Sequence, residues 1–283
     1  MKLRPLDDLP KYSPWPARLL GLEPWPEKRR TPDEIEREFG REKWGELLER
    51  FRKNPGAGLD EVDRWAAGDP KETLVALGDD LVLMTPEESH AAYLDIVAGA
   101  LQPHLNAAGL VELGCGYGSV ILGLARRAEF AGIPLFAADC TSTGPELAAA
   151  IASREGTALS TGWCDLASGR TAGITIPEGS TVFTAYAAQY IEPIGDAFVE
   201  GLSALRPAAV VHVEPVYEHC DESTLLGLLR RRYIQANGYN RNLVTILHDH
   251  EARGSLKIIA ESSPAFGPNP LLAASVIAWV PQG

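Results

Sequence analysis

The pattern of apolar and polar positions divides the chain into two parts. From about residue 109 onward, short apolar runs alternate with amphipathic stretches of helical period, which is typical of a parallel sheet with crossover helices. Two last apolar runs, joined by a proline-rich loop, suit an antiparallel pair at one side of that sheet. The expected strands lie near 109–113, 133–138, 157–162, 180–185, 208–214, 254–262 and 271–280, and the expected helices near 118–130, 144–153, 193–205 and 222–236.

The N-terminal part follows a different pattern. Six prolines interrupt residues 1–27, yet this stretch also carries tyrosine and tryptophan side chains that need burial, so we expect an ordered arm lying on the body. Two segments, Thr31–Glu34 and Thr85–Glu88, each combine an N-cap threonine, a proline at the first helical position and a capping-box glutamate. Helices are therefore expected over 31–53, 59–67 and 86–101, with a hairpin over 74–84.

Together these elements predict a doubly wound, Rossmann-like α/β fold with an antiparallel C-terminal strand pair and a helical N-terminal extension. We place the extension at residues 1–85 and the α/β domain at 86–283. The extension is expected to serve as a lid over a pocket, as a homodimer contact, or as both.

Composition narrows the classes of protein that fit. An apolar fraction of 45% excludes a disordered chain, and a net charge of −12 argues against a nucleic-acid partner and favours a small neutral or cationic one. The four cysteines form no C-x-x-C pair and are expected to be reduced thiols, as in the cytoplasm. The first residues lack the apolar run of a signal peptide, and no run is long enough to cross a membrane, so neither secretion nor a membrane partner is expected.

The strongest motif lies between the first strand of the α/β part and its helix: Val111-Glu112-Leu113-Gly114-Cys115-Gly116-Tyr117-Gly118-Ser119. Glycines at such a junction let the backbone turn sharply and approach a nucleotide closely. Asp139 follows about 20 residues later at the end of the next strand, where an acidic side chain faces ribose hydroxyls in nucleotide-binding α/β folds.

Two residues of this motif bear on which nucleotide binds. The third glycine of the dinucleotide fingerprint is replaced by Ser119. Glu112 would repel a pyrophosphate, whereas its carboxylate suits a cofactor that carries a cationic amino group or a sulfonium. A nicotinamide-dependent oxidoreductase is therefore the more remote alternative.

Glu112, Gly114, Gly116 and Gly118 fill the E/D-x-G-x-G-x-G pattern of class I S-adenosylmethionine-dependent methyltransferases, which the chain resembles over about residues 86–283. The resemblance implies a seven-stranded sheet, with S-adenosylmethionine as the cofactor and its methionine part on the glycine turn near Glu112.

The resemblance also assigns the adenosine side of the cofactor site. It implies that Asp139 binds the ribose and that Asp165 meets the adenine amino group. Three cysteines adjoin the cofactor residues and are expected as small side chains near the adenosine: Cys115, Cys140 and Cys164.

The residues that handle the substrate are expected in the loops after the fourth and fifth strands, because ligands of open α/β sheets bind outside the carboxyl ends of the strands. The segment 184–192 departs from the N-P-P-Y pattern of many nucleic-acid and protein amide methylases, which puts that subclass in doubt. Our candidate catalytic residues are Glu192, Glu214, Glu218, Tyr186 and His219, and our candidate substrate-binding residues are Gln189, Tyr190, Tyr217, Tyr233, Asn237 and Tyr239.

The acidic character of these loops favours methyl transfer to nitrogen in a small, cationic, amino-acid-like metabolite, such as a guanidine or an amine. O-methylation of a hydroxylated natural product or sugar is the alternative, with His219 as general base. A scaffold that binds the cofactor without transferring a methyl group is a third reading.

Other conspicuous residues are expected to be structural. The arginine run 230–232 complements a helix dipole, and His212 lies inside a strand as a core histidine. His248 and His250 are two residues apart, a spacing that puts both on one face of a strand but not on one face of a helix, and they lack a third ligand, so no metal site is expected. His90 is assigned no role.

Overall fold

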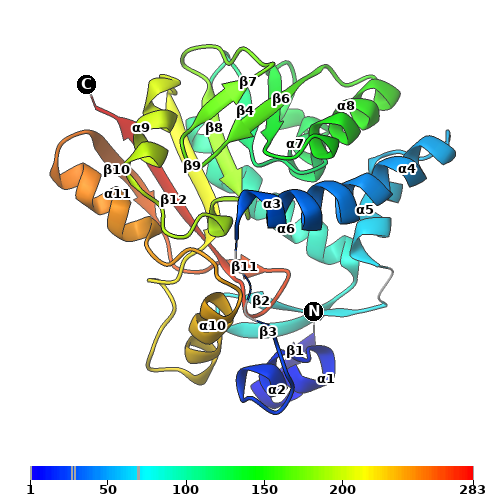
Figure 1. The fold of residues 1–283 in the computed structure, drawn as a ribbon, viewed down its shortest axis with the longest axis vertical. Helices are drawn as coiled ribbons and strands as arrows, with labels where there is room; N and C mark the ends of the chain where they lie inside the picture. Colours follow the sequence, from blue (N-terminus) through cyan, green and yellow to red (C-terminus); the bar gives the residue numbers. More distant parts are fainter. Residues whose placement is uncertain (1, 27, 29, 69–70, 283) are drawn as a thin grey trace.

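The computed structural model describes residues 2–26, 28, 30–68 and 71–282, and its core is one large mixed sheet with helices packed on both faces (Figure 1). Within these residues the strand order is β1-β3-β2-β11-β12-β9-β8-β4-β5-β6-β7, with β10 paired to β12. The strands span β1 Lys2–Arg4, β2 Thr73–Leu77, β3 Asp80–Met84, β4 Leu110–Leu113, β5 Leu135–Asp139, β6 Leu159–Asp165, β7 Arg170–Ala172, β8 Thr181–Ala185, β9 Ala209–Pro215, β10 Leu256–Glu261, β11 Phe266–Gly267 and β12 Ala274–Pro281.

The helices connect these strands and cover them. They span α1 Leu9–Tyr12, α2 Trp15–Leu19, α3 Pro32–Ile35, α4 Glu46–Lys53, α5 Leu59–Ala67, α6 Pro86–Leu101, α7 Ser119–Ala125, α8 Thr143–Glu155, α9 Asp196–Ala204, α10 Leu225–Ala236 and α11 Leu243–Ala252. The 3-10 turns are η1 Leu6–Asp8, η3 Gln102–His104, η4 Ala128–Phe130 and η5 Ala188–Tyr190, and the π-helical segment η2 is Glu36–Gly45.

The predicted α/β fold is confirmed. Strands β4, β5, β6, β8 and β9 are parallel, β12 runs antiparallel to β9, and β10 pairs with β12 as the antiparallel C-terminal pair. Alternate residues of a strand point to opposite faces: Leu110 joins the hydrophobic core on one face and Val111 the core on the other. The carboxyl ends of the parallel strands therefore meet at one edge between two packed layers.

The helix starts that the sequence predicts are present. The hydroxyl of Thr31 accepts a hydrogen bond from the Glu34 N–H, and that of Thr85 accepts one from the Glu88 N–H. The Glu88 carboxylate also accepts a hydrogen bond from the Thr85 N–H, which completes a capping box. The helical segment formed by α3, η2 and α4 therefore begins where the local sequence predicts, and so does α6.

The N-terminal extension shares the sheet of the α/β domain. Its hairpin β2–β3 joins the sheet through β11, which pairs with both β2 and β12. The proline-rich arm is ordered over the described residues: short helices form between the prolines, and Trp15 is buried with ring contacts to Trp25 and Tyr233, each 4.4 Å between centroids. The same sheet therefore crosses the boundary placed at residue 85.

Helix α11 is not among the elements expected from the sequence. His248 and His250 lie on helix α11 and not on a strand, because the apolar residues Leu243, Ile246 and Leu247 recur at helical spacing and bury one face. His250 lies on that buried face and binds Asp196, whereas His248 points to Glu261 on β10.

Arg230 and His212 are structural, as expected. The buried Arg230 guanidinium donates to Asp79, to the Gly78 carbonyl and, through Nε, to the Pro270 carbonyl, so its role is to anchor the hairpin loop. His212 lies between the hydroxyl of Thr184 and the indole N–H of Trp279, and burial lowers the pKa of its imidazole to about 3.

Two features are absent from the described ranges. None of their helices combines the length and the apolar character needed to cross a bilayer. Nor do these ranges contain a group of three or more His, Cys, Asp or Glu side chains placed to hold a metal ion.

Candidate functional site

The turn after β4 depends on its glycines. Gly114, Gly116 and Gly118 have φ values of 82°, 51° and 80°, a left-handed region in which other residues are strained. A side chain at position 114 would overlap Ala187, and a β-carbon at 116 would lie 3.0 Å from Cζ2 of Trp44. The backbone of this turn is therefore bare and closely surrounded.

Asp139, at the end of β5, holds the turn in place. One carboxylate oxygen accepts from the Gly116 N–H at 2.9 Å, and the other accepts from the Thr141 N–H and hydroxyl at 2.9 and 2.7 Å. Because each carboxylate oxygen has more than one acceptor position, Asp139 retains capacity for hydroxyl groups of a ligand.

Two buried carboxylates flank the turn on the strand edge. Glu112 on β4 is 2% exposed and accepts from the Ile121 N–H at 3.0 Å; Glu214 on β9 is 1% exposed. In the described part of the chain no Lys or Arg side chain forms an ion pair with Glu112, Glu214 or Asp139. Burial raises the pKa of Glu112 well above its ordinary value and that of Glu214 to about 7. In the absence of a cation from the described residues, burial favours the protonated forms of Glu112 and Glu214, and a cationic ligand would favour their charged forms.

The loop after β8 is shaped by Glu214. Its carboxylate accepts from the backbone N–H groups of Ala187, Ala188 and Gln189 at 2.9, 2.9 and 3.3 Å. Tyr186 has a φ of 55°, a strained value for a tyrosine, and its hydroxyl donates to the Leu272 carbonyl. Strain held by surrounding hydrogen bonds is common at functional sites.

Two buried polar atoms near Tyr186 have no hydrogen-bond partner among the described residues: the Tyr93 hydroxyl and Oε1 of Gln189. The Tyr93 ring lies 5.5 Å from that of Tyr186, and the pKa of Tyr93 is raised well above its usual value by burial and, further, by the nearby Tyr186, Glu112 and Glu214. Tyr93 lies on α6, outside every motif, and nothing in its sequence context separates it from a core aromatic residue.

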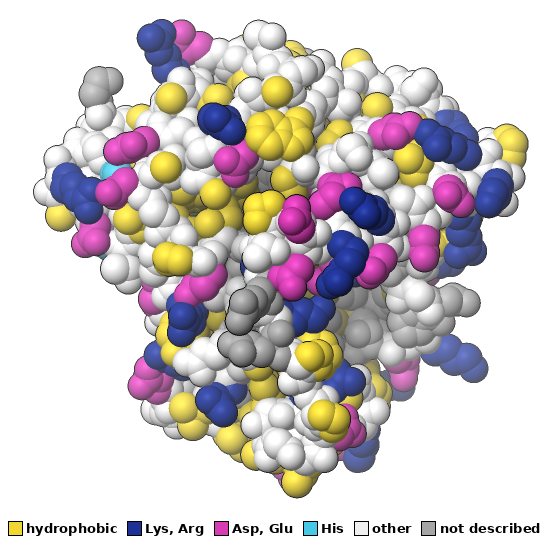
Figure 2. Space-filling view, in the orientation of Figure 1, with side chains coloured by type: hydrophobic (Ala, Val, Ile, Leu, Met, Phe, Trp, Pro, Cys, Tyr) yellow, Lys and Arg dark blue, Asp and Glu magenta, His cyan; other side chains and the backbone are white. Residues whose placement is uncertain are grey.

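The continuous helical segment formed by α3, η2 and α4 crosses this site. In Figure 1 it runs in front of the ends of the parallel strands, and in Figure 2 hydrophobic side chains gather in a recess beside its first half. The Thr143 hydroxyl donates to the Gly40 carbonyl, and Phe39 packs against Tyr190 with ring centroids 5.0 Å apart. The π-helical conformation of this stretch is rare in proteins, and where it occurs it often lies at a functional site.

Three of the candidate catalytic residues are engaged with partners outside the glycine turn. Oε1 of Glu192 accepts from Nε and Nη2 of Arg241, and Glu218 accepts from the Thr245 N–H and hydroxyl. His219 is held between the Ser275 hydroxyl at 2.9 Å and Glu261 at 2.8 Å. Of the five candidates, Glu214 and Tyr186 are therefore the two that the structure brings together beside the turn.

The candidate substrate-binding residues separate into two groups. Gln189 and Tyr190 belong to the loop after β8, and Tyr239 packs on Tyr190 with ring centroids 5.4 Å apart. The others contact helix α10 or the N-terminal arm: Tyr217 accepts from Gln235, Tyr233 packs on Trp15, and the Asn237 carbonyl accepts from Arg30.

Arg30 joins these groups. Its guanidinium lies over the rings of Tyr190 and Tyr239, at 5.0 and 4.7 Å, and pairs with Glu38 at 3.1 Å. The arm is thereby fastened to the loop after β8 by a cation between two aromatic faces.

On the adenosine side, Asp165 closes a local turn by accepting from the Ala167 N–H and the Ser168 hydroxyl. Trp163 is partly exposed beside it and donates to the Cys140 carbonyl at 3.1 Å. Cys115, Cys140 and Cys164 are free thiols, of which Cys115 and Cys164 are buried. An aromatic face and a carboxylate therefore border the ends of β5 and β6.

No protein-family model matches the chain, and no curated protein matches it in sequence. Similar solved structures include the [4+2]-cyclase SpnF (13% identity, TM-score 0.48, covering 68% of this chain and 81% of that one). Others are geranyl diphosphate C-methyltransferase from Streptomyces coelicolor A3(2), solved with Mg²⁺, geranyl diphosphate and S-adenosyl-L-homocysteine (12%, 0.47, 70% and 81%), and a SAM-dependent methyltransferase from Geobacter sulfurreducens, solved with S-adenosyl-L-homocysteine (15%, 0.45, 68% and 91%). The similarity is one of fold.

Proposed function

We propose that this chain, whose fold is that of the class I S-adenosylmethionine-dependent methyltransferases, transfers a methyl group from S-adenosylmethionine to a small polar metabolite. The observation that carries the proposal is the group of buried carboxylates around a glycine turn, Glu112, Asp139 and Glu214, which form no ion pair with a Lys or Arg of the described residues. Burying an uncompensated carboxylate is costly, and a cationic ligand that also carries hydroxyl groups removes that cost.

The residues present fit that cofactor. The left-handed glycines of the turn after β4 let the backbone come close to a bound chain, and Glu112 offers a carboxylate to an ammonium or sulfonium group. Asp139 has free acceptor positions for ribose hydroxyls, while Trp163 and Asp165 border the place of the adenine. When bound, S-adenosylmethionine supplies an electrophilic methyl group.

We further propose that the methyl acceptor is a nitrogen of a cationic, amino-acid-like substrate. An amine must lose its proton before it can attack, and Glu214, with a pKa of about 7, is matched to accept a proton near neutral pH. Oε1 of Gln189 is a free acceptor for a substrate N–H, and the Tyr93 hydroxyl is a free donor. The role of these groups is to hold and align the acceptor, since alignment supplies most of the help that such a displacement needs.

The structure favours nitrogen over oxygen as the acceptor atom through one observation. The His219 imidazole, the candidate base for a hydroxyl, has both ring nitrogens bound, to Ser275 and to Glu261.

We also propose that the helix over the glycine turn acts as a lid, since Trp44 and Phe39 contact both sides of the site.

The first test is calorimetric titration with S-adenosylhomocysteine and, separately, with oxidised nicotinamide dinucleotide. We expect micromolar binding of the former, weakened about tenfold or more by Glu112→Gln, which keeps the hydrogen bond to the Ile121 N–H and removes the charge. Glu200→Gln, an exposed change of charge on α9, is the control. Binding of the dinucleotide alone would refute the methyltransferase proposal.

The second test measures methyl uptake. Labelled S-adenosylmethionine is supplied with arginine, related guanidines and amines in one set, and with hydroxylated metabolites and sugars in the other. Transfer to the first set supports the nitrogen proposal, and transfer only to the second set overturns it in favour of O-methylation. Cofactor binding with transfer to neither set would favour a non-transferring scaffold.

A further inference from the structure

A second cavity lies apart from the strand ends, between helices α5, α6 and α7. Its volume is about 490 Å³, and its lining combines apolar residues, among them Ala66, Ala67 and Ala91, with acidic residues, arginines and one histidine. Since α7 begins at Ser119, the cavity lies beside the helix that follows the glycine turn. Concave sites that combine apolar walls with polar groups are the usual form of small-molecule sites.

The deepest polar group of this cavity is Asp63 on α5. One carboxylate oxygen accepts from the Tyr117 hydroxyl at 2.8 Å and from the Ser119 hydroxyl at 2.7 Å. The other oxygen faces Nε2 of His90 on α6 at 3.4 Å. Burial raises the pKa of Asp63, which reflects incomplete compensation of its charge. His90, for which the sequence predicts no role, thus belongs to this cavity.

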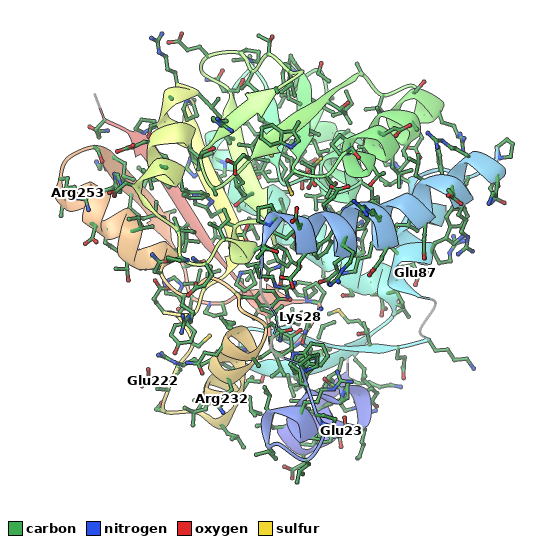
Figure 3. The ribbon with its side chains drawn as sticks, in the orientation of Figure 1. Glu23, Lys28, Glu87, Glu222, Arg232 and Arg253 are labelled. Carbon is green, nitrogen blue, oxygen red and sulfur yellow. The ribbon has the colours of Figure 1, made fainter. Side chains whose placement is uncertain are left out.

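The arginines of the lining do not neutralise the carboxylates that face the cavity. Arg126 pairs with Asp60 and Glu155, Arg127 pairs with Asp95, and Arg64 pairs with Glu61. Glu87, at the first turn of α6 and labelled at the right of Figure 3, has neither an ion pair nor a hydrogen bond within the described residues. Glu87 at the rim is therefore left for a ligand, whereas Asp63 has hydroxyl and imidazole partners but no Lys or Arg partner among the described residues.

We propose that this cavity binds an aliphatic diamine or polyamine, with one ammonium group at Asp63, the other at Glu87, and the methylene chain against the apolar wall. Two carboxylates match two ammonium groups, and an alkyl chain between them would bury exposed apolar surface on Ala66, Ala67 and Ala91. The site shares Tyr117 with the glycine turn, because the Tyr117 ring packs on Trp44 at 5.0 Å.

The test is calorimetric titration of the full chain, without any adenosyl ligand, with 1,5-diaminopentane, spermidine and n-pentylamine. Failure of the methyltransferase proposal therefore leaves this result unaffected. We expect the diamine to bind at least tenfold more tightly than the monoamine at low ionic strength. Glu87→Gln should remove that difference, while Glu200→Gln, an exposed glutamate on α9, should preserve it.

Two further variants separate the roles of charge and space. Asp63→Asn keeps acceptors for Tyr117 and Ser119 and should weaken both amines about tenfold. Ala91→Phe, at an exposed helical position of the lining, should block all three ligands without changing charge. Equal binding of diamine and monoamine, or binding that none of the three variants changes, would overturn the proposal.

Discussion

The indole of Trp44 lies on the backbone of Gly116, so that even a β-carbon at position 116 would come within 3.0 Å of the ring. Trp44 belongs to the N-terminal extension and Gly116 to the turn after the first parallel strand. A ligand bound on the turn would therefore be covered by the extension, and its rate of release should depend on this contact.

Replacement of Trp44 by alanine tests that dependence. We expect S-adenosylhomocysteine to bind about tenfold more weakly to Trp44→Ala, because the apolar cover over the turn is lost while the turn itself is unchanged. Trp65→Ala removes an indole from α5 in the same extension and is the control. Surface plasmon resonance should locate the loss in the dissociation rate; tighter binding would mean that Trp44 obstructs the cofactor.

The ionisation of Glu214 predicts a pH dependence. Between its ordinary pKa of 4.5 and about 7, the folded chain holds a proton on this group that the unfolded chain has lost, so the free energy of unfolding should fall as pH rises through that window. Glu214→Gln should flatten the fall, measured by urea unfolding at a series of pH values. A stability that rises with pH equally in both proteins would contradict this.

Glu214 should also couple binding to proton release. A cation beside a carboxylate favours its charged form, so S-adenosylmethionine should release protons on binding at about pH 6.5. Titration in two buffers of different ionisation enthalpy measures this release. We expect S-adenosylmethionine to release more protons on binding than S-adenosylhomocysteine, whose sulfur is uncharged. The release should be smaller in Glu214→Gln.

Tyr93→Phe should separate stability from activity. The Tyr93 hydroxyl is buried and has no partner among the described residues, so its removal should leave the free energy of unfolding unchanged or raise it by about 1 kcal/mol. If the hydroxyl binds a ligand, kcat should fall about tenfold in the same variant. Tyr12→Phe, on the exposed arm, is the control, and unaltered kcat and KM in Tyr93→Phe would exclude a role in the site.

Arg30→Gln should loosen the arm. The Arg30 side chain is 5% exposed, pairs with Glu38 and lies over two tyrosine rings, so we expect a loss of about 2 kcal/mol in stability. Arg37→Gln, whose exposed side chain approaches Glu42 only at 3.9 Å, should cost little. Limited proteolysis should cut Arg30→Gln faster near the arm; equal cutting of both variants would count against this anchor.

The sequence predicted the parts of the fold that local chemistry determines. Thr31 and Thr85 announce helix starts because a cap needs only residues within one turn. The glycine turn could be recognised because left-handed backbone and close approach both require glycine at fixed spacing. Helix α11 was not predicted, since the spacing of its two histidines suits a strand face. The helical period lies in the apolar residues that precede them.

The partners of the candidate site residues could not be predicted in this way. His219 meets Glu261 and Glu192 meets Arg241, each more than 40 residues away, and the sequence does not encode such pairs by spacing. Tyr93 resembles a core aromatic residue until its hydroxyl is seen to lack a partner. The charge balance at the strand ends likewise depends on which cations are absent nearby, which is a property of the folded chain.

The pairing of β2 with β11 has a consequence for folding. Strand β2 (Thr73–Leu77) pairs with β11 (Phe266–Gly267), which lies almost 200 residues later in the chain. The hairpin gains this neighbour in the sheet only after β11 has been synthesised. During synthesis from the N-terminus this hairpin has an open edge until nearly the whole chain has emerged. Contacts so distant in sequence slow folding, so the chain should be most prone to aggregation while it is being made.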